Sequence, residues 1–214
     1  MSLRIFVPYE TTALSLGAED VATLIRREAD ARGLDIELVR NGSRGLCWLE
    51  PLVEVDDGRG RRAFGPVAPE DVASLFEHGF SDDHPLAQGP TEEIPYLKRQ
   101  QRVTFARIGV TDPVSLADYR ALGGFDGLEK AVHRTPQQLV DMVKASGLRG
   151  RGGAAFPTGI KWQTVLDAKG AQKYIVCNAD EGDSGTFADR LVMESDPYML
   201  IEGMIIAGLA VGAT

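Results

Sequence analysis

Residues 147–162 read GLRGRGGAAFPTGIKW, and they decide how the second half of the chain is expected to fold. Five glycines and two arginines in this stretch lead into a helix predicted over 159–168. A strand is predicted over 173–177, KYIVC, and an acidic loop over 178–186 follows it. This order is typical of open α/β domains, in which ligands lie beyond the carboxyl ends of the strands.

The glycine-rich loop has the chemistry of an anion site. Glycines let the backbone approach a ligand closely, and exposed N–H groups before a helix N-terminus suit a phosphate. Arg149, Arg151 and Lys161 add positive charge. The spacing fits neither the dinucleotide fingerprint nor the P-loop. The alternatives are a mobile loop with solvated arginines or an RGG-like RNA contact, with Phe156 and Trp162 as core aromatics.

The acidic loop carries three carboxylates within four residues, at Asp180, Glu181 and Asp183. Such a loop binds a metal, does acid–base work, or accepts hydrogen bonds from sugar hydroxyls and amides. The full EF-hand pattern is missing. The alternative is a solvated loop in which Asp183 or Ser184 caps the next helix. Cys177, on the predicted strand, is expected to be a small core residue.

The first part of the chain predicts a separate domain. Strands are predicted over 3–8 and 35–40 with a helix over 19–32 between them, and Gly33 ends that helix. A hairpin then follows, with strands over 51–56 and 61–64 around Asp57-Gly58, and a helix over 70–79 opens at Pro69. A βαβ unit followed by ββα is the thioredoxin-like plan. We therefore expect a thioredoxin-like domain over 1–78, a linker over 79–110, and the first part of a Rossmann-like α/β domain, incomplete, over 111–214.

Composition limits the classes of function. The net charge of −8 makes the chain as a whole a poor nucleic-acid binder. Two cysteines, Cys47 and Cys177, cannot build a disulfide scaffold or ligate an iron–sulfur cluster alone. The start of the chain lacks the pattern of a signal peptide, which favours the cytoplasm. Residues 198–214 predict a buried helix too short to cross a membrane, and a domain rarely ends inside such a helix, so we expect a piece of a longer protein.

The motifs GLRGRGGAAFPTGIKW and CNADEGDSGTFADR (177–190) resemble the flavin-binding 51-kDa-type subunit of complex I, NADH:quinone oxidoreductase. That family includes the diaphorase subunits of NAD-reducing hydrogenases and of NAD-dependent formate dehydrogenases. The resemblance covers about residues 90–214. It is strongest to the beta subunit of cytoplasmic, molybdenum- or tungsten-dependent formate dehydrogenase.

The resemblance implies a flavin site and a nucleotide site. The positions that match FMN-holding residues are Gly150, Arg151, Gly152, Gly153, Lys161, Asn178, Asp180 and Glu181. Phe156 matches an aromatic residue that stacks on the adenine of NAD(H). Asp183 stands where the family has a glutamate near the nucleotide, usually before a proline, and here Ser184 follows instead. The family's [4Fe–4S] cysteines lie in a later segment that this chain does not contain.

The same family often carries a thioredoxin-like [2Fe–2S] domain at its N-terminus. In residues 41–55, NGSRGLCWLEPLVEV, Ser43 stands where a ligand cysteine is expected, and Cys47 alone remains. Four thiolates are needed for the cluster. This domain therefore resembles a relic without a cluster that serves as a docking module for another subunit.

The function implied is hydride transfer between FMN N5 and nicotinamide C4, with single electrons passing between FMN and iron–sulfur clusters. The donor is expected to be formate, and the partners are a thioredoxin-like [2Fe–2S] subunit and a molybdenum or tungsten catalytic subunit, with no nucleic acid and no membrane insertion. The cofactors do the chemistry, so we assign no catalytic side chain and no metal ligand. The alternatives are a non-catalytic assembly module, the diaphorase subunit of a hydrogenase or of complex I, and an unrelated enzyme with a phosphate ligand. The isolated fragment is expected to be inactive.

Overall fold

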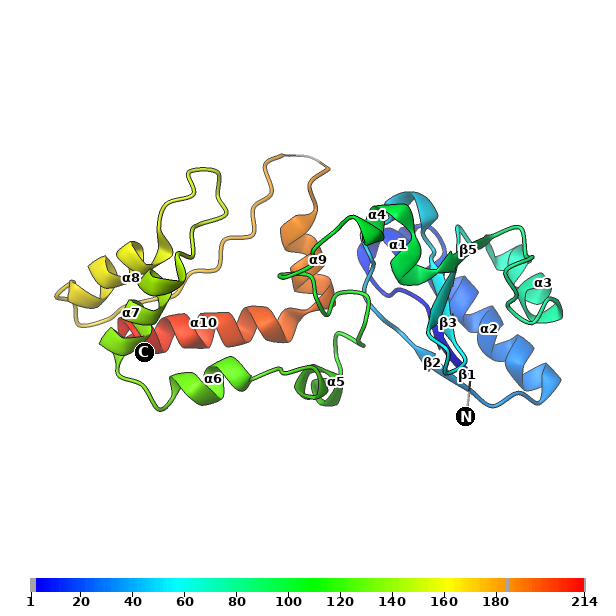
Figure 1. The fold of residues 1–214 in the computed structure, drawn as a ribbon, viewed down its shortest axis with the longest axis horizontal. Coiled ribbons are helices and arrows are strands. Elements are labelled where there is room, and N and C mark those ends of the chain that lie inside the picture. The colour runs from blue at the N-terminus through cyan, green and yellow to red at the C-terminus, as the bar shows by residue number, and fades with distance from the viewer. Residues whose placement is uncertain (1–2, 184, 214) are drawn as a thin grey trace. The chain divides into compact units, whose positions relative to one another are not determined.

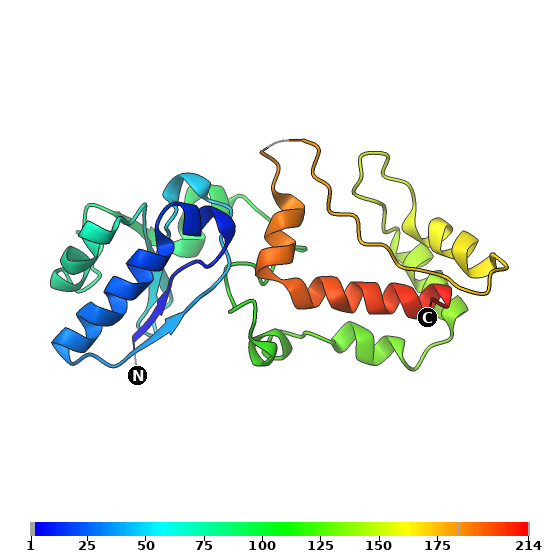
Figure 2. The same ribbon diagram turned by 180° about the vertical axis from the view of Figure 1, so that it is seen from behind.

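The computed structural model describes residues 3–183 and 185–213. The chain divides into two units (Figures 1 and 2). The first comprises Met1–Asp118 and Asp183–Pro197, and the second comprises Tyr119–Gly182 and Tyr198–Thr214. The chain thus leaves the second unit after Gly182, contributes one segment to the first, and returns.

A five-stranded sheet forms the centre of the first unit, with strand order β2-β1-β3-β4-β5. Its strands are β1 (Leu3–Phe6), β2 (Ile36–Val39), β3 (Val53–Asp56), β4 (Arg61–Phe64) and β5 (Ala87–Pro90). The β1 and β2 strands are parallel, and the remaining neighbours are antiparallel. The helices of this unit are α1 (Thr11–Ser15), α2 (Ala18–Arg32), α3 (Val72–Glu77), α4 (Pro95–Lys98) and α9 (Ala188–Ser195). The predicted order of βαβ followed by ββα is confirmed.

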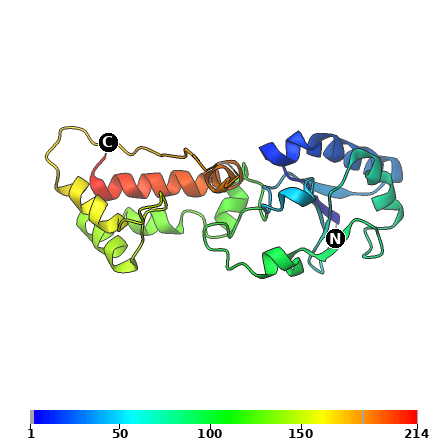
Figure 3. The ribbon, with the colours of Figure 1, turned by 90° about the horizontal axis from the view of Figure 1, so that it is seen from above.

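One face of this sheet carries the larger core. Helix α2 turns Val21, Ile25 and Ala29 inward at helical spacing, and all three are buried. Gly33 ends the helix in the left-handed region, with φ of 63°. Figure 3 shows α2 lying along one side of the strands. Because the side chains of a strand alternate, Phe64 belongs to this core, whereas Ala63 faces a second cluster.

The hairpin between β3 and β4 forms as predicted, with Asp56 paired to Arg61 in the register. The Asp56 carboxylate accepts a hydrogen bond from the Gly58 N–H at 2.8 Å, which fixes the turn. Residues 79–110, expected as a linker, contribute β5 to the sheet and α4 to the second cluster. This stretch is therefore part of the first unit.

In its described residues the second unit is built from helices and loops. Its helices are α6 (Asp126–Ala131), α7 (Pro136–Ser146), α8 (Thr158–Asp167) and α10 (Pro197–Val211). Helix α5 (Leu116–Ala121) contains the boundary between the two units. The α7 helix begins with a capping box between Thr135 and Gln138 and ends at Gly147, with φ of 69°. Leu139, Val140 and Ala210 are buried together, and Trp162 packs against them.

The strand predicted over 173–177 does not form, and Cys177, expected in a core, is exposed. A strand needs a neighbour for its backbone hydrogen bonds, and the described part of the second unit holds no strand to supply one. Lys173 instead donates from Nζ to the carbonyls of Leu166 and Val211, at 2.9 and 3.1 Å. Its ammonium group therefore satisfies the last turns of α8 and α10.

The apolar helix predicted over 198–214 forms as α10, but it is not buried on all sides. Ile201, Ile205 and Leu209 are exposed, at a spacing of four residues that gives one stripe. No described helix is long and apolar enough to cross a membrane. The charge within it, Glu202, is buried at 8% exposure.

Candidate functional site

The glycine-rich loop is a hairpin-like excursion between α7 and α8. Its base is closed by hydrogen bonds from Gly150 N to the Phe156 carbonyl and from Thr158 N to the Leu148 carbonyl, both 2.9 Å long. Arg149 links the two sides of the loop, because its Nε donates to the Ala155 carbonyl at 2.6 Å. Arg149 therefore has a structural role in the loop as well as a charge.

The tip of this loop leaves backbone donors unused. Within the described chain, the N–H groups of residues 151–154 donate to no protein acceptor. Gly153 needs its left-handed φ of 88°, whereas Gly152 has no such requirement. A Cβ at Gly152 would meet nothing within 4 Å. Packing within the chain therefore does not explain why this position lacks a side chain, while a ligand held against the backbone would.

Two cations stand at this loop. Arg151 is exposed and makes no ion pair or hydrogen bond with the described residues. The Lys161 ammonium lies 5.9 Å from the centre of the Phe156 ring, and a Cβ at Gly150 would be 3.9 Å from it. Phe156 is 46% exposed. The structure thus brings the backbone donors, a cation and an exposed aromatic ring together before the N-terminus of α8, an arrangement suited to a phosphate and a planar ring.

Close packing between α7 and α8 fixes the base of the loop. A Cβ at Gly159 would lie 2.7 Å from the backbone nitrogen of Lys144 and 2.8 Å from its Cα. Only a glycine therefore permits this approach of the two helices. Gln137 and Gln163 exchange hydrogen bonds of 2.8 and 3.1 Å across the same pair. This contact holds the N-terminus of α8 in place.

The acidic loop belongs to the second unit as far as Gly182. Asn178 accepts a hydrogen bond from the Asp180 N–H at 2.9 Å, so this side chain shapes the loop locally. Asn178 and Asp180 are exposed, and Glu181 is half-buried. Figure 1 shows this loop and the glycine-rich loop extending on the same side of α10.

Asp183 lies at the point where the chain enters the first unit. Helix α9 begins at Ala188 with Phe187 at the N-cap, so Asp183 does not cap it, and Ser184 lies outside the described residues. The described residues contain no group of three or more metal-type side chains.

The family resemblance places a [2Fe–2S] cluster at loop 41–50 of the first unit. In this chain, side chains of the loop itself are hydrogen-bonded to one another there. The buried Ser43 hydroxyl donates to Glu50 at 2.6 Å and accepts from the Gly45 N–H at 2.9 Å. Glu50 also accepts from the Leu52 N–H at 2.9 Å. Burial raises the pKa of Glu50 to about 7 despite these hydrogen bonds. Cys47 is exposed.

Sequence reasoning missed two buried ionic centres. Arg44 makes two bonds of 2.9 Å to Glu54 and a third to Glu92, and it is 4% exposed. Glu202 accepts from the N–H groups of Phe125 and Leu128 at 2.8 and 2.9 Å, and from the Tyr119 hydroxyl. A lone charge in an apolar run was the available signal for Glu202, but its partners lie more than seventy positions away.

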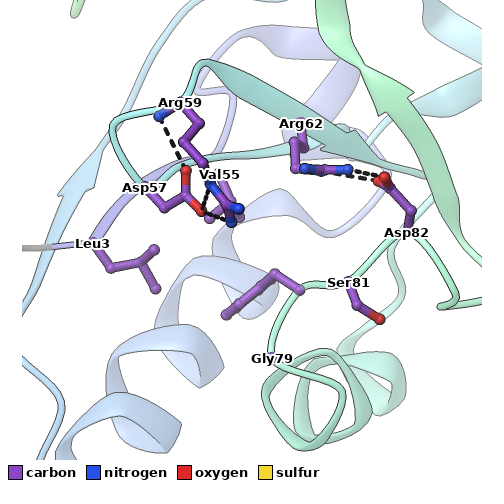
Figure 4. A pocket seen from close by; sticks show the side chains of 9 residues that line it. Leu3, Val55, Asp57, Arg59, Arg62, Gly79, Ser81 and Asp82 are labelled. Carbon is purple, nitrogen blue, oxygen red and sulfur yellow. Dashed lines mark hydrogen bonds and ion pairs between the residues drawn. The ribbon is translucent and has the colours of Figure 1, made fainter.

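A hollow of about 240 Å³ lies in the first unit beside the β3–β4 turn (Figure 4). Its charged side chains are already paired, Arg59 with Asp57 and Arg62 with Asp82. The Arg59 guanidinium holds the pKa of Asp57 at about 2. These pairs leave little charge free for a ligand, so the glycine-rich loop is the stronger candidate site.

Comparison with known proteins agrees with this choice. Residues 143–214 match the family model of the Nuo51 FMN-binding domain. The chain is 56% identical over 117 residues to the HndC subunit of an NADP-reducing hydrogenase from Solidesulfovibrio fructosivorans, covering 55% of this chain and 24% of that protein. It is 51% identical over 112 residues to an NADH-quinone oxidoreductase subunit of Rhizobium meliloti, covering 52% and 27%. For an NADH-quinone oxidoreductase subunit of Escherichia coli the identity is 46% over 103 residues, covering 47% and 23%.

The matched segments thus span about a quarter of the length of these relatives. Among solved structures, the chain is similar to an NAD⁺-reducing [NiFe]-hydrogenase, with a TM-score of 0.42 and 22% identity over 99% of this chain and 36% of that one. The second half of the chain is thus similar to an FMN-binding domain and to part of NADH-quinone oxidoreductase subunits.

Proposed function

We propose that this chain is part of an FMN-binding flavoprotein subunit of the NADH-dehydrogenase type. The observation that carries the proposal is the tip of the glycine-rich loop, where free N–H groups, an unhindered Gly152 and the unpaired Arg151 adjoin the N-terminus of α8. A phosphate needs donors and positive charge in that combination. The match of residues 143–214 to an FMN-binding domain supports FMN as the phosphate-bearing ligand.

The residues at the loop would divide the work of binding. The phosphate would be held by the backbone N–H groups of Gly152 and Gly153 and by the charges of Arg151 and Lys161. Gly150, whose N–H is bonded to the Phe156 carbonyl, would form the base of this site. FMN, when bound, supplies hydride exchange with nicotinamide and single-electron exchange with iron–sulfur clusters. Because the cofactor carries the redox chemistry, no side chain of this chain is assigned proton transfer.

The acidic loop would bind the other end of the flavin. Asn178, Asp180 and Glu181 would accept or donate hydrogen bonds at the ribityl chain and ring. The carboxylates of Asp180 and Glu181 would also disfavour negative charge on the reduced flavin ring, which lowers the reduction potential of the flavin. Phe156, with its exposed ring, would stack on the adenine of NAD(H), and Asp183 would stand near the nucleotide.

The electron donor and partners follow from the same family. We infer formate as the donor, with a molybdenum or tungsten catalytic subunit, a thioredoxin-like [2Fe–2S] subunit and a cytoplasmic location, because the motifs resemble the formate dehydrogenase branch. The similarity to HndC favours hydrogen as the alternative donor, and the complex I relatives make NADH oxidation a third possibility. A non-catalytic assembly module is the remaining alternative.

The test is the visible absorption spectrum of the native complex that contains this chain, recorded anaerobically before and after NADH or NADPH is added. Flavin bands that bleach support the proposal, and a complex without flavin refutes it. Arg151→Ala should lower the flavin content, whereas Lys169→Ala, at an exposed cation outside the loop, should not. Reduction of the bound flavin by formate but not by hydrogen gas would support the formate assignment, and the reverse would replace it with the hydrogenase one.

A further inference from the structure

Helix α9 is held by the thioredoxin-like unit, although it follows the acidic loop in sequence. Glu194 accepts a hydrogen bond from the Thr11 N–H at 2.8 Å and a second from the Thr11 hydroxyl at 2.5 Å. Thr11 is the first residue of α1, so its N–H has no partner within that helix. Glu10 accepts from the next two N–H groups of α1. Glu194 therefore completes a cap that the local sequence leaves unfinished.

Two further polar contacts fasten the same segment. Arg190 donates from Nη2 to the Thr12 hydroxyl at 2.6 Å, one residue along α1. At the end of α9, Asp196 accepts from Arg107 Nε at 2.9 Å, and Asp196 is only 4% exposed. A buried ion pair with this geometry costs much to break, because one charge would stay buried alone. The segment is thus tied at both ends of α9.

Close packing provides a third contact, between α9 and the loop that contains Ser43. A Cβ at Gly42 would lie 2.2 Å from Ser195 Cβ and 3.1 Å from its Cα, so Gly42 must be a glycine while α9 is docked. Ser195 is fully buried. Gly45 in turn faces Leu191, whose methyl carbon would be 3.7 Å from an added Cβ. The loop that contains Ser43 therefore forms part of the surface that receives α9.

We propose that the thioredoxin-like unit is a clamp that holds α9 and thereby positions the end of the acidic loop. Asn178, Asp180 and Glu181 lie in the second unit, and the chain enters the first unit at Asp183. The loop is therefore attached to the second unit at one end and to the clamp at the other. Thr11 and Glu194 are positioning residues in this arrangement. The proposal rests on the proposed function, since the acidic loop is where FMN would be bound.

The test uses the full-length subunit in its native complex and three variants. Thr11→Val removes one hydroxyl at nearly constant shape, and Glu194→Gln removes the charge that accepts both bonds. Thr11→Ser restores the hydroxyl and is the matched control. Hydrogen exchange is measured by mass spectrometry over residues 178–195, with β1 and β3 as an internal reference, and FMN affinity is measured by fluorescence titration.

Thr11→Val and Glu194→Gln should raise amide exchange over residues 178–195 by about tenfold, since hydrogen bonds to charged groups are the strong class. They should leave exchange in β1 and β3 unchanged and weaken FMN binding several-fold, and Thr11→Ser should behave as the wild type. Unchanged exchange in α9 would overturn the clamp. Faster exchange in α9 with unchanged FMN affinity would overturn the role of the clamp in positioning the acidic loop. A wild-type complex without FMN would refute the proposed function instead, and the exchange data alone would then decide whether the clamp exists.

Discussion

Replacing Glu50 by glutamine should change how the stability of the thioredoxin-like unit depends on pH. Burial raises the pKa of Glu50 from 4.5 to about 7, and the nearby carboxylates of Glu10 and Glu54 contribute to the rise. The hydrogen bonds from Ser43 and Leu52 act in the opposite direction but do not outweigh burial. The folded protein therefore binds a proton at Glu50 that the unfolded chain has released at neutral pH.

The sign of the effect follows from proton linkage. Because the folded pKa is raised, the stability contributed by protonated Glu50 is complete below pH 4.5 and is lost as the pH rises through about 7. Between pH 5 and pH 8 the loss is about 2.5 kcal/mol for a shift of this size. Glutamine does not titrate, so the variant should lack this component of the pH profile.

The hydrogen bonds around residue 50 decide how stable the Glu50→Gln variant is relative to the wild type at each pH. The glutamine oxygen can accept from the Leu52 N–H, and its amide can donate to the Ser43 oxygen. The Ser43 hydroxyl hydrogen then loses its acceptor, at a cost of about 1 kcal/mol. Glu50→Gln should therefore be less stable than the wild type at pH 5 and more stable at pH 8. The two profiles should cross between these values.

Urea unfolding from pH 5 to pH 8 measures the difference directly, because all other titrating groups are common to both proteins. Trp48 fluorescence reports on the first unit when Trp162, in the second, is replaced by phenylalanine in every protein compared. Glu77→Gln, at an exposed glutamate of α3, is the control and should run parallel to the wild type. Parallel profiles for Glu50→Gln and the wild type would refute the reasoning, since they would mean that Glu50 is ionised in the folded state at pH 5.

Two predictions concern the second unit. Gly159→Ala should destabilise it by about 1–3 kcal/mol, because the added methyl group would overlap the backbone of Lys144. Gly170→Ala should have a small effect, because the added Cβ would lie at an ordinary contact distance of 3.6 Å from the Gln172 carbonyl oxygen. Thermal unfolding followed by Trp162 fluorescence compares the two variants, and equal midpoints would contradict the packing described. Glu202→Ala should cost about 2–4 kcal/mol in urea unfolding, because it strands several buried donors at once, and a loss below about 1 kcal/mol would show that Glu202 does not cap α6.

Local signals in the sequence were enough for most of the first unit. The Asp57-Gly58 turn, the periodic apolar residues of α2 and Gly33 each act over a few residues, so the hairpin and the helix could be predicted without knowledge of their neighbours. The capping box of α7 is equally local. The order of elements, βαβ followed by ββα, could be predicted from these signals, whereas β5 lies in the stretch expected to be a linker.

Contacts between distant residues could not be predicted in the same way. An apolar run such as KYIVC satisfies the pattern of a buried strand, yet a strand forms only beside a partner, and residues 173–177 have none among the described strands. In the sequence Glu202 is only a charge within an apolar helix, although in the structure it caps α6. The contact of Glu194 with Thr11 joins positions 183 residues apart, so no window of sequence contains both.

The charges of the two loops differ in a way that would orient a ligand. The glycine-rich loop carries Arg151 and Lys161 with unused backbone donors, so it attracts an anion, whereas Asp180 and Glu181 repel one. A ligand with a phosphate at one end and neutral hydroxyl and N–H groups at the other can satisfy both loops in a single orientation only. FMN has this polarity under the proposed function, and the reverse orientation would place its phosphate among carboxylates. The separation of charge therefore favours one binding direction before any shape complementarity is considered.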